Sequence, residues 1–104
     1  LRLLQLADAS LDSPAWNGGN TAIEALSLGT PVISMAGEFM RGRHALAFLS
    51  LASTPGLVAK SDEDFVSLAI DSGRRESLME GLDVGSLYED RAPVAELDRF
   101  LLSL

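Results

Sequence analysis

The segment that most constrains the fold runs from residue 17 to residue 35. It begins with the glycine pair Gly18-Gly19, continues with apolar residues at helical spacing over residues 21–28, and then reaches Gly29, a typical helix terminator. Residues 31–35 are short, β-branched and bounded by glycines, which predicts a buried parallel strand. A loop, a helix and a strand therefore follow one another, as in the repeating unit of a parallel α/β sheet.

The rest of the chain shows the same alternation of expected strands and helices. Apolar runs closed by turn residues predict two further strands, and helical spacing predicts three more helices before residue 83. We expect strands over residues 8–11 and 57–59 and helices over residues 41–50, 61–71 and 74–82. The fold class is therefore α/β, with about three short parallel strands flanked by helices. A doubly wound domain usually has five or six strands, so this pattern corresponds to half of one.

Residues 83–93 are expected to form a loop, and residues 93–104 to form a terminal amphipathic helix. Its apolar positions Leu97, Phe100 and Leu101 are expected to face inward. At the other end of the chain, a half-sheet leaves an apolar edge near Ala9. Such an edge favours self-association of the chain.

Composition excludes several classes of protein. Eight basic residues against fifteen acidic ones give a net charge of −7, which argues against a nucleic-acid-binding module. The absence of cysteine excludes disulfides, thiol catalysis and Cys-ligated metals. No run of eighteen apolar residues exists, so we expect a cytoplasmic protein that does not enter the membrane. The first residue is Leu1 rather than Met, which fits either a piece of a longer chain or processing of leading residues.

The loop from Asn17 to Thr21 has the properties of an anion-binding turn. Glycines let backbone N–H groups approach a phosphate closely, and a helix that begins at Asn20 or Thr21 directs its positive end to the same place. Thr21 adds a hydroxyl donor and Asn20 an amide donor. No lysine follows the glycines, so the segment is not an ATP-binding P-loop. The alternative is a tight turn that caps a helix without binding anything.

Other candidate residues lie at the same expected sheet edge. Glu24, one turn into the helix, can accept both hydroxyls of a ribose or can simply favour the helix dipole from an exposed position. Asp12 follows the first strand and is either a ligand contact or a turn residue. Trp16 either stacks on a base or sugar or packs against the loop that it introduces.

A basic cluster of Arg41, Arg43 and His44 begins the expected second helix. A cation there can neutralise a diphosphate, whereas a solvated helix face is the alternative. His44 is the sole histidine, and no metal-ligand spacing accompanies it, so we expect no metal site. It has no evident partner for general-base catalysis either.

These residues together resemble the donor-binding lobe of the O-linked N-acetylglucosamine transferase family, in particular its bacterial members that carry tetratricopeptide repeats. The resemblance spans residues 6–82 and is carried by Leu11-Asp12-Ser13-Pro14-x-x-Asn17-Gly18-Gly19-Asn20-Thr21-x-x-Glu24-Ala25-Leu26-x-x-Gly29-Thr30-Pro31-Val32, then Ala36-Gly37-Glu38 and Arg43. It implies a GT-B enzyme of two facing Rossmann-like domains, of which residues 1–104 are a carboxyl-terminal fragment.

The resemblance also implies roles for individual residues. The segment Gly18-Gly19-Asn20-Thr21 would hold the diphosphate of UDP, Glu24 the ribose, and Arg43 would supply a cation. Members of the family often have a hydroxyl residue in the place of Asn20, which keeps a donor but changes its reach. Donor binding in such enzymes needs no metal or other cofactor.

The resemblance implies that the chemistry lies mostly outside this chain. The catalytic base and the other lobe are missing, so the fragment alone is not expected to be active. The resemblance implies two partners: a nucleotide sugar, which is UDP-N-acetylglucosamine in this family, and a protein or peptide acceptor. Two alternatives remain: the lobe of a GT-B-like UDP-N-acetylglucosamine epimerase, or a non-catalytic interaction module with an acidic surface.

Overall fold

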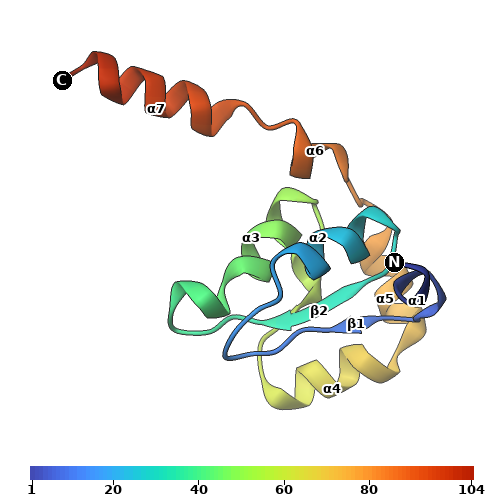
Figure 1. The fold of residues 1–104 in the computed structure, drawn as a ribbon. Helices are drawn as coiled ribbons and strands as arrows, with labels where there is room; N and C mark the ends of the chain where they lie inside the picture. The colour runs from blue at the N-terminus through green and yellow to red at the C-terminus, as the bar shows by residue number, and fades with distance from the viewer.

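Three short strands form a parallel sheet in the order β1-β2-β3 in the computed structural model, which describes residues 1–104 (Figure 1). The strands are β1 (Ser10–Leu11), β2 (Val32–Met35) and β3 (Val58–Ala59). Ser10 pairs with Val32, and Ser34 pairs with Val58. The α/β class and the parallel half-sheet that the sequence predicts are confirmed.

Helices cover both faces of this sheet. Figure 1 shows α2 and α3 on one face and α4 on the other, with α1 and α5 near the end at which the strands begin. The helices are α1 (Arg2–Leu6), α2 (Asn20–Ser27), α3 (His44–Leu51), α4 (Asp62–Ile70), α5 (Ser72–Met79), α6 (Gly85–Tyr88) and α7 (Ala92–Leu102), with the 3-10 turns η1 (Met40–Gly42) and η2 (Pro55–Leu57). No helix combines the length and apolar character needed to span a bilayer.

The core lies between β2 and the helices that pack on it. Its largest fully buried apolar side chains are Leu26, Val32, Ile33, Leu49, Leu57 and Leu68. Gly29 ends α2 with a φ of 78°, a conformation that favours glycine, as the sequence predicts. Ser61 caps α4, because its hydroxyl oxygen accepts the Asp64 N–H at 3.1 Å.

Two details of the helices differ from the sequence expectations. The helix predicted to begin at residue 41 begins at His44 instead, because η1 occupies residues 40–42 and turns the chain first. On α4, the apolar spacing of the sequence predicts that Val66 and Ile70 belong to the buried face, but they are 56% and 78% exposed. Only one side of that helix meets the sheet, so these two positions face away from it.

The carboxyl-terminal part of the chain departs furthest from expectation. The predicted loop over residues 83–93 contains the short helix α6, which packs against α3. Helix α7 projects away from the sheet (Figure 1), and none of its residues is buried. The expectation that Leu97, Phe100 and Leu101 face inward is wrong, since each is more than half exposed. No element of this chain packs on that apolar face.

The edge of the sheet at β1 is free, as the sequence predicts. β1 pairs only with β2, and Leu11 is 58% exposed. Self-association through this edge stays a prediction.

Candidate functional site

The start of α2 presents unpaired backbone donors at the carboxyl edge of the sheet. The N–H groups of Asn20, Thr21 and Ala22 have no acceptor within the chain, and the capping residue Gly19 supplies no side chain to them. Asn20 and Thr21 are both exposed. Because the helix dipole places partial positive charge at the same point, this end of α2 can bind an anion.

The two glycines before α2 are not required by the fold. Neither has a positive φ, and a Cβ built on Gly19 would meet nothing within 4 Å. A Cβ on Gly18 would make only ordinary contacts, the nearest at 3.7 Å to Thr21. Since packing does not demand glycine at either position, close approach of a ligand is the remaining physical reason for a pair of them.

Asp12 holds this turn in place. Its Oδ1 accepts the Gly18 N–H at 2.9 Å, and its Oδ2 accepts the Ser34 hydroxyl at 2.8 Å. The carboxylate thereby ties the turn to the end of β2. This is the turn role that the sequence left open for Asp12, and direct contact with a ligand stays a prediction.

Asn17 joins the loop after β1 to the loop after β2. It is 3% exposed; its amide nitrogen donates to the Ser13 carbonyl at 3.0 Å, and its Oδ1 accepts the Ala45 N–H at 3.1 Å. Its backbone N–H also donates to the Arg41 carbonyl at 2.7 Å. Sequence reasoning placed Asn17 in the motif but not among the site residues, although an Asn between a strand and a glycine pair is a typical turn residue.

The two loops touch along their backbones. Within the loop after β2, the Gly37 N–H donates to the Gly42 carbonyl at 2.7 Å, and both glycines lie against Pro14 of the loop after β1. A Cβ on Gly42 would lie 3.0 Å from the Pro14 carbonyl oxygen and 3.1 Å from the Gly37 Cα. Glycine is therefore required here by packing, in contrast to the pair before α2.

The basic residues of the second loop lie just before α3. Arg43 is exposed and donates from one guanidinium nitrogen to the Gly37 carbonyl at 3.0 Å. This hydrogen bond stabilises the loop after β2 and leaves the other guanidinium N–H groups free. His44 is half-buried and stacks on Phe48 with ring centroids 6.5 Å apart. Arg41 lies over the rings of Phe39 and Trp16. Trp16 is 70% exposed, so it does not pack against the loop that it introduces.

Two hollows flank the start of α2. One, of about 190 Å³, includes Asp12, Gly18 and Thr21 in its wall. The other, of about 250 Å³, is lined by Asn20, Ile23, Glu24 and Tyr88. Glu24 is exposed and faces this second hollow, where a ribose could meet its carboxylate.

Tyr88 is a residue that sequence reasoning missed, because the segment around it was expected to be a loop. Helix α6 brings it to α2, where its hydroxyl hydrogen-bonds the Ser27 hydroxyl. It is 60% exposed and shares the hollow of Glu24. No pattern in the sequence indicates this contact, since 61 residues separate the two hydroxyls.

The structure thus gathers most of the predicted residues. Asp12, Gly18, Gly19, Asn20, Thr21 and Glu24 surround the start of α2, and Arg43 lies in the neighbouring loop. No group of three or more His, Asp or Glu side chains is arranged to hold a metal ion. The arrangement offers a cationic helix start, a hydroxyl, an amide and a carboxylate to one ligand.

Comparison with known proteins identifies relatives of the chain. The family described as glycosyl transferase family 41 matches residues 1–92. A UDP-N-acetylglucosamine–peptide N-acetylglucosaminyltransferase of Caenorhabditis elegans is 41% identical over 69 residues, which are 66% of this chain and 6% of that protein. A probable enzyme of the same description, SPINDLY of Hordeum vulgare, is 33% identical over 97 residues, 93% of this chain and 9% of its own length.

A solved structure gives the same result at the level of the fold. A mutant O-GlcNAc transferase of Thermobaculum terrenum matches 96% of this chain with a TM-score of 0.73 and 27% sequence identity. The match covers 21% of that chain. The 104 residues therefore span a small fraction of the length of each protein that they match.

Proposed function

The chain belongs to glycosyl transferase family 41, and on that basis we propose that it is the donor-binding part of a protein glycosyltransferase that uses UDP-N-acetylglucosamine. One observation carries the proposal: the unpaired N–H groups at the start of α2 follow two glycines that the fold itself does not need. A diphosphate is a ligand that such a helix start suits.

Each part of the donor would meet a different group. The diphosphate would lie on the backbone N–H groups of Gly19, Asn20 and Thr21 and on the hydroxyl of Thr21. Gly18, whose own N–H is already accepted by Asp12, would leave room for the phosphates beside the turn. The ribose hydroxyls would meet the Glu24 carboxylate in the hollow that Tyr88 also lines. Asp12 would keep the glycine turn in position rather than carry charge to the ligand, since both of its oxygens already accept hydrogen bonds.

Catalysis would proceed by stabilising the leaving group. As the sugar departs, negative charge grows on the UDP phosphates, and donors fixed before the reaction stabilise that charge without reorganising. The α2 start and the free N–H groups of Arg43 supply such donors in this chain. We propose that this stabilisation needs no metal ion, and that the catalytic base comes from a part of the enzyme outside these residues. The fragment alone would then be inactive.

The relatives support a transferase over the two alternatives. They are named as transferases, which favours this activity over an epimerase, and the exposed α2 start favours ligand binding over a purely non-catalytic module. The acceptor would be a protein or peptide. We further propose that the whole enzyme carries tetratricopeptide repeats and works in the cytoplasm.

Titration of UDP into the full-length protein tests the site. Gly19→Ala adds a methyl group where the fold leaves open space, so thermal stability should not change. UDP affinity should fall about tenfold or more, because a lost charge-assisted hydrogen bond costs about 1.5–3 kcal/mol. Thr21→Ala should cost about two- to tenfold through the loss of one hydroxyl donor.

Gly73→Ala is the matched control. Gly73 lies in the exposed first turn of α5, where a Cβ would come no closer than 3.7 Å to another atom. This variant should bind UDP as the wild type does. If Gly19→Ala and Thr21→Ala also bind UDP like Gly73→Ala, the assignment of the α2 start as the diphosphate site is wrong.

A further inference from the structure

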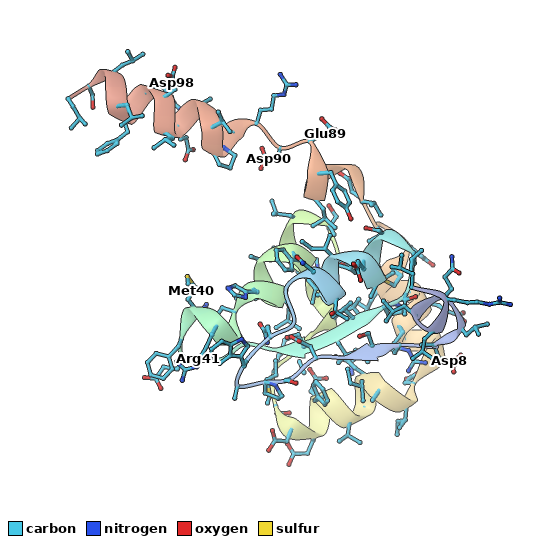
Figure 2. All side chains as sticks on the ribbon, in the orientation of Figure 1. Asp8, Met40, Arg41, Glu89, Asp90 and Asp98 are labelled. Atoms are coloured by element: carbon cyan, nitrogen blue, oxygen red, sulfur yellow. The ribbon has the colours of Figure 1, made fainter.

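Three side chains form an exposed cluster at the tip of the two loops, which we call the rim cluster: Trp16, Phe39 and Arg41. The Arg41 guanidinium carbon lies 4.7 Å from the Phe39 ring centroid and 5.8 Å from that of Trp16. Trp16 is 70% exposed and Phe39 57%. Figure 2 shows Met40 and Arg41 at the end of the molecule where the loops after β1 and β2 turn.

The backbone beneath the rim cluster is rigidly held. Asn17, the residue next to Trp16, donates its N–H to the carbonyl of Arg41 at 2.7 Å. The side chain of Asn17 is buried and anchored to both loops. Trp16 and Arg41 are therefore fixed next to each other by the same residue, and the cluster is exposed without being on a loose loop.

Arg41 differs from Arg43 in the same loop and from the two arginines of α5, Arg74 and Arg75. Arg43, Arg74 and Arg75 each donate to an oxygen of this chain. The Arg41 guanidinium has no hydrogen bond or ion pair within the chain, not even with its near neighbour Glu38. Its guanidinium carbon lies over two aromatic rings, and its N–H groups have no acceptor within the chain. A carboxylate, which accepts two parallel N–H bonds, suits such a group.

The position of the cluster indicates which substrate would bring that carboxylate. The donor diphosphate, in the function proposed above, lies at the start of α2. Arg41 belongs to the other loop and is the free cation at its tip, in a chain whose net charge is −7. A free cation beside two exposed aromatic rings suits a polypeptide segment that carries both a carboxylate and apolar side chains, as the second substrate would.

We propose that the rim cluster binds an acidic segment of the acceptor polypeptide. Arg41 pairs with an Asp or Glu side chain of the acceptor, and Trp16 and Phe39 cover the apolar part of the same segment. The inference rests on the proposed transferase function and adds a substrate preference to it: acceptors with a carboxylate near the modified hydroxyl.

Peptide binding to the full-length protein in the presence of UDP tests this inference. Two fluorescein-labelled peptides with a central serine differ only in carrying Asp or Asn on its flanks, and anisotropy gives the Kd of each. The wild type should bind the Asp peptide about fivefold more tightly, the upper range for one exposed ion pair. Arg41→Gln should remove this difference and leave the Kd for UDP unchanged.

Two further variants sharpen the test. Arg41→Glu should reverse the preference, so that a peptide with Lys in the flanking positions binds more tightly than the Asp peptide. Arg91→Gln removes an exposed arginine at the start of α7, away from the rim, and should keep the wild-type preference.

The inference is overturned if the wild type binds both peptides equally, if neither peptide binds, or if Arg41→Gln keeps the preference. It is also overturned if Arg41→Gln weakens UDP binding as much as peptide binding, because Arg41 would then be a donor contact. Failure of the proposed function gives a different result, namely a wild-type protein that does not bind UDP.

Discussion

Replacement of Asn17 by alanine should loosen the loops that frame the site while leaving the sheet intact. The side chain makes two hydrogen bonds, one to the Ser13 carbonyl and one from the Ala45 N–H. Alanine leaves both groups without their partner. Ala45 is fully buried, so water does not replace the lost acceptor there, whereas Ser13 is exposed and its carbonyl can be hydrated.

The cost follows from this difference. An unsatisfied buried N–H costs about 1–3 kcal/mol, and a lost bond at an exposed carbonyl about 0.5–1 kcal/mol, so local opening should become easier by about 1.5–4 kcal/mol. Each 1.36 kcal/mol changes an equilibrium about tenfold. Hydrogen exchange of amides in residues 37–45 should therefore accelerate about 10- to 1000-fold, provided that exchange reports the local opening equilibrium.

Asn20→Ala is the matched control for hydrogen exchange of the ligand-free protein. It also replaces an asparagine by alanine, but the Asn20 side chain is exposed and makes no hydrogen bond within the chain. Exchange over residues 37–45 should then match the wild type, and amides in α4 should be unaffected in both variants. Unchanged exchange in Asn17→Ala, or equal acceleration in Asn20→Ala, would refute the idea that Asn17 fastens the loops.

Two further predictions concern stability. Gly42→Ala should lower the Tm, at a cost of about 1–3 kcal/mol, because the added Cβ meets the backbone of Pro14 and Gly37 at 3.0–3.1 Å and neither can rotate away. Its control, Gly19→Ala, should keep the wild-type Tm. Hydrogen bonds from the Lys60 N–H and then from Arg74 hold the pKa of Asp64 below its usual 3.8. The ionised carboxylate therefore stabilises the fold above pH 3.8, and this stabilisation is lost as the pH falls below that value and the carboxylate is protonated. Asp64→Asn should therefore lower the Tm at neutral pH, with the difference from wild type disappearing in acid; a difference that persists there would contradict the reasoning.

The predictable parts of the fold are those that local sequence determines. The loop, helix and strand of residues 17–35 were recognisable because glycines, apolar spacing and a β-branched run lie next to one another in the chain. Helix α7 was recognisable as a helix for the same reason. Its inward face was not predictable, since burial depends on a partner element, and no element of this chain covers Leu97 or Phe100. Amphipathic spacing indicates that a helix has an apolar face suited to packing, but it does not show which element packs against that face.

The same limit applies to the candidate site. The start of α2 was predictable because its donors belong to consecutive residues. Residue type and spacing could not distinguish Arg41 from Arg43, since both lie in one short basic run, and only the family resemblance singled out Arg43. What distinguishes them is the approach of one loop segment to another: Arg43 reaches the Gly37 carbonyl, whereas Arg41 meets two aromatic rings. Tyr88 was missed because its contact with α2 joins residues 61 positions apart.

The glycines show most clearly how structure changes the interpretation of a motif. In the sequence, Gly18, Gly19 and Gly37 have equal status, since each follows a predicted strand and allows a turn, whereas Gly42 falls in a predicted helix. In the structure, a Cβ at Gly37 or Gly42 would press against backbone, whereas one at Gly19 would enter open space. Glycine at positions 37 and 42 is therefore required by the packing of the two loops. Glycine at position 19 needs a reason other than packing, and the free N–H groups beside it supply one. The fold is tight where it builds the edge of the site and open where a ligand would bind.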